Sequence, residues 1–224
     1  MDESTALSIL GFNEPVSLDD IKKSYKKLII KNHPDKNTKY SLKKFLEILD
    51  SYVFLKDLYT RTNHEHESYA KFHLLLKTIF TNWDESKYNN ALKNLEILML
   101  EHSELHELFY VKAMTHVYLN DFVSAIQSFE YCSGFENEVS YWNNMAFCYS
   151  KIDNYPKVIT CSDTILNLNP SNPEKWWFNK AISFYELNQL EKSIDCFDKV
   201  LEFNPSDDDA RELREKTVKK LEKN

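Results

Sequence analysis

The strongest constraint on the fold is an internal repeat that fills most of the chain. The segments WNNMAFCYSKIDNYPKVITCSDTILNLNP (142–170) and WFNKAISFYELNQLEKSIDCFDKVLEFNP (177–205) share a leading Trp, an Ala four residues on, then an aromatic, and a closing Asn-Pro. Another copy covers 109–133, and a weaker one begins near Phe72. Units of this length bury their apolar faces only by stacking, so we expect a superhelix of helix pairs with a concave face.

One position in the second helix of each copy carries the period most clearly. Equivalent residues follow one another at spacings of 34, 33 and 35 residues: Ala91, Ala125, Val158 and Ser193. The copies resemble the tetratricopeptide repeat at four kinds of position, occupied here by Trp142 and Trp177, Ala146 and Ala181, Tyr149 and Phe184, and Pro170 and Pro205. The alternative interpretation is an irregular helical bundle.

The composition agrees with an all-α protein. Two glycines and six prolines in 224 residues are too few for a fold of strands and tight turns, whereas 42% hydrophobic residues suffice for a core. A formal net charge of −7 argues against non-specific nucleic-acid binding. No apolar run reaches membrane-spanning length and the first residues are acidic, unlike a signal peptide, so we expect the cytosol, with the nucleus as an alternative, and no membrane partner.

The residues that bind metals or act as nucleophiles give weak signals. The cysteines form no Cys-x-x-Cys pair and are expected to be free, buried thiols: Cys132, Cys148, Cys161 and Cys196. His64, His66 and His73 are interleaved with glutamates and suggest a metal site, but a solvated linker is the favoured interpretation. With no phosphate-binding glycine loop and no nucleophile motif, we expect no enzyme activity, no metal and no cofactor.

The first 65 residues lack the repeat and predict a helical hairpin. Ser17 is the expected N-cap, with Asp20 three residues later to close a capping box. The helix that follows should stop near Asn32, because the residue before a proline leaves the helical region. Its buried stripe is predicted to be Leu18, Ile21, Tyr25 and Leu28. A second helix at about 40–57 should face inward through Leu42, Phe45, Ile48, Tyr52 and Leu55.

The segment ALSILGFNEPVSLDDIKKSYKKLIIKNHPDKN resembles a J domain. The resemblance lies in ILG, in IKKSYKKL on the second helix and in the His-Pro-Asp-Lys-Asn signature, and KKFLEILDSYVFLKD is similar to the third helix. It covers about residues 4–61. The resemblance implies a co-chaperone, because J domains dock on an ATP-bound DnaK-type heat-shock chaperone and trigger its ATP hydrolysis.

The same resemblance implies where docking takes place. His33, Pro34 and Asp35 would press on the partner's ATPase near its interdomain linker, and Asp35 would accept a charge-assisted hydrogen bond from a partner arginine. The lysines on the preceding helix would steer a negatively charged partner surface: Lys22, Lys23, Lys26 and Lys27. The alternative is a solvated lysine face beside an ordinary turn.

The inner helices of the repeats predict a peptide groove. Repeats of this family often clamp an acidic chaperone terminus with a Lys-Asn-Asn-Lys-Arg set, of which Asn144 and Lys175 are present, while Tyr110, Met114 and Asn179 replace the others. The remaining lining is mostly apolar or aromatic: Tyr110, Met114, Phe147, Phe178, Ile182 and Tyr185. Such a lining suits an apolar peptide better than an acidic tail, unless some of these side chains pack between repeats.

Three aliphatic side chains depart from the J-domain pattern. Leu46, Leu49 and Val53 stand where charged or small polar surface residues are usual, within about 60° of one another on the third helix. We expect the first repeat helix to cover them, through Leu74, Leu75, Leu76 and Phe80. The alternative is a contact with a second molecule.

Together these patterns predict an all-α protein with a J domain at 1–65, a junction at 66–71 and repeats over 72–207. The individual repeats are placed at 72–105, 106–138, 139–173 and 174–207, with a capping helix at 208–224. The predicted function is a co-chaperone that stimulates a DnaK-type chaperone through its J domain and binds client or partner polypeptides on its repeats. The alternative is a scaffold that assembles one complex, with the J domain recruiting the chaperone to remodel it.

Overall fold

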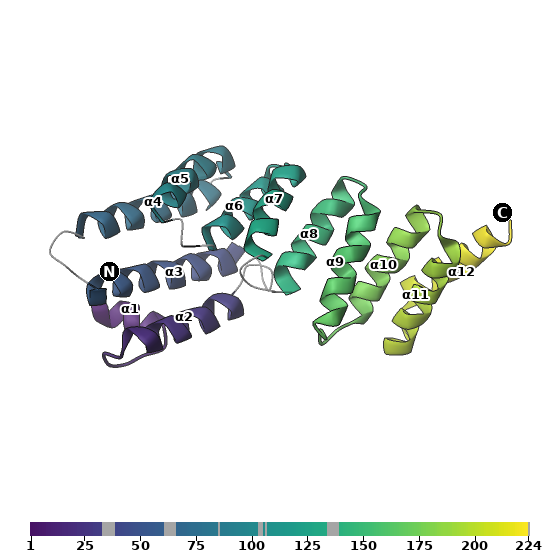
Figure 1. Ribbon diagram of the computed structural model, residues 1–224, viewed down its shortest axis with the longest axis horizontal. Helices are drawn as coiled ribbons and strands as arrows, with labels where there is room; N and C mark the ends of the chain where they lie inside the picture. Colours follow the sequence, from purple (N-terminus) through teal and green to yellow (C-terminus); the bar gives the residue numbers. More distant parts are fainter. Residues whose placement is uncertain are drawn as a thin grey trace. The chain divides into compact units, whose positions relative to one another are not determined.

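The computed structural model describes residues 1–32, 39–60, 66–84, 86–102, 105, 107–133 and 139–223. In these ranges every regular element is an α-helix, so the all-α prediction is confirmed (Figure 1). The helices are α1 (Glu3–Ile9), α2 (Leu18–Lys31), α3 (Lys39–Thr60), α4 (His66–Asp84), α5 (Tyr88–Glu101), α6 (Glu107–Tyr118), α7 (Phe122–Ser133), α8 (Val139–Lys151), α9 (Tyr155–Asn167), α10 (Glu174–Glu186), α11 (Leu190–Phe203) and α12 (Asp208–Leu221).

The chain divides into two compact units at the start of α6. The first unit is Met1–Leu108 and the second is Phe109–Asn224. The first therefore holds α1 to α5, including the weakest of the four repeat copies. The domain boundaries expected from the sequence remain a prediction.

In the first unit, α1, α2 and α3 surround a small core. The Ser17 hydroxyl accepts a hydrogen bond from the Asp20 backbone N–H at 3.2 Å, which confirms the predicted N-cap. The Tyr25 ring stacks on that of Tyr52, with centroids 4.0 Å apart. The buried side chains include Ala6, Leu10, Ile21, Ile29, Phe45, Ile48 and Leu55.

The prediction for the buried stripe of α2 is confirmed at Ile21 and Tyr25 and differs at the ends. Ile29 is buried, whereas Leu18 and Leu28 are only partly buried. A hydrophobic stripe drifts around a helix with 3.6 residues per turn, so positions 28 and 29 are both near its edge and only packing decides between them. The side chain of Leu42 lies outside the described residues.

The aliphatic stripe on α3 is covered, as predicted. Leu46, Leu49 and Val53 are 4%, 0% and 8% exposed. Leu46 lines a small cavity together with Leu76 of α4. Next to it, Asp50 Oδ2 lies 2.7 Å from His73 Nδ1.

The details of this cover differ in part from the expectation. Leu74 is 64% exposed and points away from the core, while Phe72, Leu76 and Ile79 are buried. These three residues follow the spacing of 4 and 3 that defines one face of α4, and Leu74 falls off that face. The Phe80 side chain lies outside the described residues.

The same turn joins the two helices of all four repeat copies. Each has one residue with a backbone φ of 54° to 58° at its centre: Ser86, Asn120, Asp153 and Asn188. The N–H of the next residue donates to the carbonyl five residues earlier, at 2.6, 2.9, 2.9 and 2.8 Å in chain order. This is the Schellman motif that ends many helices. The weaker first copy, α4–α5, is therefore a helix pair of the same kind.

The small residues that carry the period lie where the paired helices meet. Ala91, Ala125, Val158 and Ser193 are at most 4% exposed. The Ser193 hydroxyl donates to the Ala181 carbonyl of the facing helix at 2.8 Å. Close approach of the two backbones explains why bulky residues are absent from this position.

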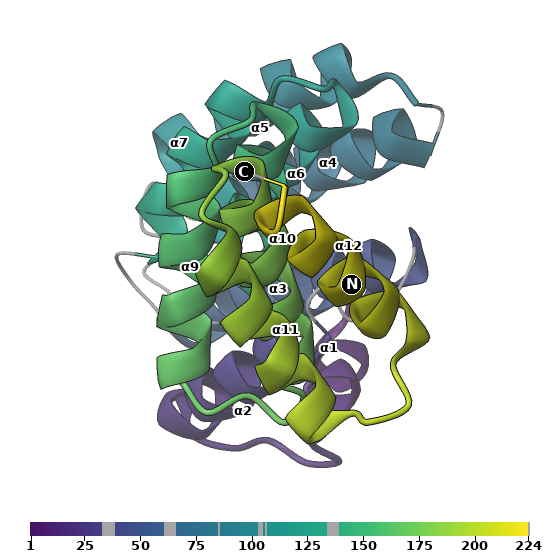
Figure 2. The same cartoon turned by 90° about the vertical axis from the view of Figure 1, so that its right-hand side faces the viewer.

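In the second unit, α6 to α12 follow one another as successive antiparallel neighbours (Figure 1). Figure 2 views the chain from the side on which α12 lies nearest the viewer, beside α11. Asp207 caps α12 by accepting the Ala210 N–H at 2.9 Å. Ala210 is buried in the cluster that holds Phe197 and Val200, so α12 closes the last hydrophobic core of the array.

Candidate functional site

The first candidate surface is the outer face of α2. Asp19 and Asp20 in the first turn favour this helix through its dipole, and Ile21, Tyr25 and Ile29 bury the opposite face. All four predicted docking lysines are exposed: Lys22, Lys23, Lys26 and Lys27. Lys22 Nζ lies 3.9 Å from Asp19, a surface pair that contributes little to stability. The face is therefore basic and open to a partner.

The predicted docking signature follows this helix in the sequence. His33, Pro34 and Asp35 lie outside the described residues. α2 ends at Lys31, as predicted, and the Asn32 side chain donates to the Leu28 carbonyl at 2.8 Å. The helix that presents the lysines therefore ends directly before the signature.

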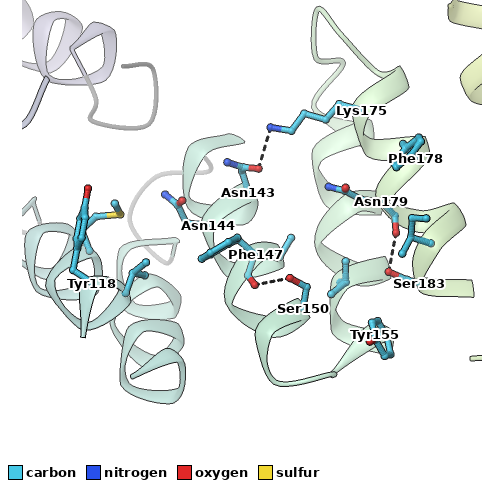
Figure 3. A pocket seen from close by; sticks show the side chains of 15 residues that line it. Tyr118, Asn143, Asn144, Phe147, Ser150, Tyr155, Lys175, Phe178, Asn179 and Ser183 are labelled. Carbon is cyan, nitrogen blue, oxygen red and sulfur yellow. Dashed lines mark hydrogen bonds between the residues drawn. The ribbon is translucent and has the colours of Figure 1, made fainter. Parts of the chain in front are cut away.

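The second candidate surface is a groove of about 710 Å³ in the repeats. Its walls come from α6, α8, α9 and α10, and Figure 3 shows them from close by. The lining residues are Met114, Val117, Tyr118, Asn143, Asn144, Ala146, Phe147, Ser150, Tyr155, Val158, Lys175, Phe178, Asn179, Ile182 and Ser183.

The groove is apolar and aromatic, with amides spaced along it. Phe147 is 44% exposed, so its ring is available to a ligand. Lys175 is the single cation among the lining residues, and its Nζ lies 3.4 Å from Asn143 Oδ1 and 4.6 Å from the ring centroid of Trp176. A lone lysine already held by an amide and a ring is a weak anion trap, because anion capture relies on converging charges.

Seven of the nine residues predicted for the groove line it: Met114, Asn144, Phe147, Lys175, Phe178, Asn179 and Ile182. Tyr110 does not, and the prediction for this residue is wrong. It is completely buried, its ring centroid is 5.6 Å from that of Phe129, and its hydroxyl accepts a 3.4 Å hydrogen bond from Asn144. The side chain packs between helices because position 110 lies on the face of α6 turned toward α7 and α8.

Tyr185 lies outside the groove as well. Its ring contacts lysines of α12 and lines a different pocket. Conversely, sequence reasoning missed Tyr118, Asn143 and Ser150. Tyr118 stands four residues after Met114, so helical periodicity could have found it.

The four cysteines are buried, and most of the predicted histidine cluster lies outside the described residues. All four cysteines are free and buried, as predicted. Burial raises the pKa of the Cys148 and Cys161 thiols to about 12 and that of Cys196 to about 11, so each stays protonated and unreactive at neutral pH. His73 pairs with Asp50, and His64 and the His66 side chain lie outside the described residues, within which no three metal-binding side chains converge.

Comparison with known families gives two matches, one near each end of the chain. Residues 6–65 match the DnaJ domain, and residues 174–207 match the tetratricopeptide repeat. The chain carries a J domain followed by tetratricopeptide repeats. Neither the J domain nor the repeat is an enzyme family. None of the described helices is both long and apolar enough to cross a membrane.

Curated relatives resemble the J domain part. The chain is 39% identical to the chaperone protein DnaJ of Rhodospirillum centenum over 66 aligned residues. The aligned segment covers 29% of this chain and 17% of that protein. It is 38% identical to the DnaJ protein ERDJ7 of Oryza sativa subsp. japonica over 66 aligned residues. This second aligned segment covers 29% of this chain and 21% of that protein. The matches thus span about a fifth of each relative's length.

Solved structures resemble the helical repeat fold. MamA from Desulfovibrio magneticus RS-1, from residue 41 to its end, gives a TM-score of 0.54 at 15% identity and covers 68% of this chain and 94% of that one. A second crystal structure of a MamA protein gives 0.52 at 12% identity, over 84% of this chain and 93% of that one. At these identities the likeness shows the fold alone.

Proposed function

We propose that this protein is a co-chaperone whose J domain stimulates ATP hydrolysis by a DnaK-type chaperone. The match of residues 6–65 to the DnaJ domain carries the proposal. The exposed lysines of α2 support it, because a basic face on the helix that directly precedes His33, Pro34 and Asp35 in the sequence attracts an acidic partner surface. The lysines speed encounter, and the His-Pro-Asp loop acts on the ATPase once the partner is bound.

The repeats hold the polypeptide that the chaperone acts on. An extended peptide presents apolar side chains together with unpaired backbone N–H and C=O groups. The groove meets both needs, since Phe147 and Phe178 offer apolar surface and the amides of Asn144 and Asn179 can donate and accept hydrogen bonds. ATP hydrolysis then closes the chaperone on a client that the repeats keep in an extended form.

The test of the J-domain part is single-turnover ATP hydrolysis by a DnaK-type chaperone with and without this protein. Wild type should accelerate hydrolysis, and His33→Gln should abolish the acceleration while circular dichroism shows an unchanged helical signal. His64→Gln, the same substitution outside the signature, is the matched control and should behave as wild type. Equal stimulation by His33→Gln and wild type would refute the mechanism.

A scaffold that assembles one complex is the alternative function. Affinity capture with wild type and His33→Gln, read by mass spectrometry, separates the two. A broad set of unfolded polypeptides supports client binding, whereas one folded partner recovered by both proteins supports a scaffold.

A further inference from the structure

The last helix of the array has a basic face. Three lysines at spacings of 3 and 1 residues share one side of α12, Lys216, Lys219 and Lys220, and Lys223 follows just after the helix ends. The sequence predicted only a solvated capping helix here. The local excess of positive charge is unexpected in a chain whose net charge is −7.

This face forms a pocket of about 480 Å³ with Tyr185 of α10. Lys220 Nζ lies 4.2 Å and Lys216 Nζ 5.8 Å from the centroid of the Tyr185 ring. Cation–π attraction thus draws two ammonium groups toward one point. Glu212 and Glu215 also line the pocket, so its lysines exceed its carboxylates by two.

The pocket continues the inner stripe of α10. Lys175, Phe178 and Ile182 of this stripe line the apolar groove, and Tyr185 follows Ile182 after three residues. Three residues of helix correspond to a rise of about 4.5 Å. A single extended peptide, at about 3.3 Å per residue, can therefore reach from the groove into the pocket within a few residues.

We propose that the repeats recognise an extended peptide in which an apolar segment is next to an acidic one. The apolar segment lies in the groove, and the acidic side chains reach the pocket, where Lys216 and Lys220 converge on a carboxylate. This inference rests on the proposed client-binding function of the groove. It assigns charge selectivity to α12 and not to Lys175, the cation inside the groove.

The test measures the affinity of the full chain for fluorescent peptides by anisotropy. The peptides share one apolar, aromatic segment and end in a short run of glutamates or, in the matched peptide, of glutamines. The glutamate peptide should bind about tenfold tighter, as expected for a charged hydrogen bond of about 1.5 kcal/mol. The difference should shrink as salt rises, because exposed charges are screened.

Charge reversal tests whether the preference for the glutamate peptide comes from the lysines of the pocket. Lys216→Glu with Lys220→Glu should remove the glutamate preference and leave the affinity for the glutamine peptide unchanged. The control is Lys192→Glu with Lys199→Glu, which changes the net charge equally on exposed positions of α11 and should keep the preference. An equal loss in the control would show general attraction to the surface and overturn the proposal.

The outcomes separate this inference from the function on which it rests. If wild type binds both peptides with equal affinity, the groove stands and the acidic specificity is wrong. If neither peptide binds, the groove itself is not a peptide site, and the inference fails with it. Phe178→Ala should weaken binding of both peptides alike, because it removes apolar surface that they share.

Discussion

The two candidate surfaces of this protein are built from the sequence in different ways. The lysine face of α2 comes from one helix and spans positions 22 to 27, so helical spacing alone brings its members together. The groove collects side chains of four helices between Met114 and Ser183. A surface of the first kind can be located from the sequence alone. A surface of the second kind also depends on how each helix is rotated about its axis.

Tyr110 and Phe147 show how this difference limits the prediction of groove residues from the sequence. The sequence places both on inner helices as large aromatic residues, yet Tyr110 is fully buried and Phe147 is 44% exposed. A substitution at each of these two positions therefore distinguishes a core residue from a groove residue.

The largest expected effect is on folding. Tyr110→Ala should lower the free energy of unfolding by about 3–5 kcal/mol, because it empties a buried aromatic site between helices. Chemical denaturation followed by circular dichroism measures the loss. An unchanged stability combined with weaker peptide binding would mean that Tyr110 lines the groove after all.

Phe147→Ala is the counterpart within the groove. Its ring is half exposed, so stability should fall by less than about 1 kcal/mol, while affinity for an apolar peptide should fall about tenfold. Denaturation and peptide anisotropy on the same sample give both numbers. A large loss of stability with unchanged affinity would make Phe147 a core residue.

The lysine face should act on the rate of association. Lys23→Glu with Lys27→Glu should slow binding to the chaperone about tenfold at low salt, since exposed charges steer encounter. Stopped-flow association at increasing ionic strength measures this, and the wild-type rate should fall as salt rises. Lys77→Glu with Lys93→Glu, exposed on α4 and α5, is the charge-matched control. A rate that is indifferent to salt would move the contact away from α2.

A cap in the repeats should affect stability alone. Asp121 accepts the Ser124 N–H at 3.1 Å before α7, so Asp121→Ala should cost about 1 kcal/mol. Hydrogen bonding from the Ser124 side chain and then from its backbone lowers the pKa of Asp121 below 3.8. The contribution of ionised Asp121 to the free energy of unfolding is therefore complete above the pKa of Asp in the unfolded chain, about 3.9. It is lost as the pH falls through the lower pKa of Asp121 in the folded protein.

Denaturation at pH 7 and at pH 3 checks this cap, because the difference between wild type and Asp121→Ala should shrink at the lower pH. Stimulation of the chaperone should stay unchanged, since the cap lies in the second compact unit and the J domain in the first. A loss of stimulation would mean that the two units depend on each other.

The smallest effect is expected from Lys175. Lys175→Ala should change the affinity for a peptide that ends in acidic residues by less than about twofold, because one held lysine is a poor carboxylate trap. Anisotropy with the glutamate peptide measures it. Tight binding of the glutamate peptide that depends on Lys175 would mean that these repeats clamp acidic termini as related repeats do.

How far the sequence predicted the structure depends on the range of the interactions. Ser17 and Asn32 mark the two ends of α2, and both ends follow from local rules of helix capping and of residues before proline. The period of about 34 residues located all four helix pairs, including the one whose repeat copy is weakest. Leu46, Leu49 and Val53 were informative because they violate a surface pattern. The burial of Tyr110 does not follow from local rules, because it depends on the rotation of α6 against its neighbours. Helical spacing already places Leu74 off the buried face of α4.

The pocket at Tyr185 was missed for a related reason. Its lysines come from α12, which follows α11 in the chain and approaches α10 only through the stacking of the array. The spacing of lysines on α12 was visible in the sequence. Its aromatic partner was not, because nothing local connects α12 with position 185.

The packing of α4 on α3 bears on how this J domain can be exchanged between proteins. A fragment that stopped at residue 65 would lack Leu76, which lines a cavity with Leu46, and would take His73 away from the buried Asp50. Such a fragment should be less soluble and less stable than one that continues through Leu108. A chimaera that borrows this J domain should therefore borrow α4 and α5 with it.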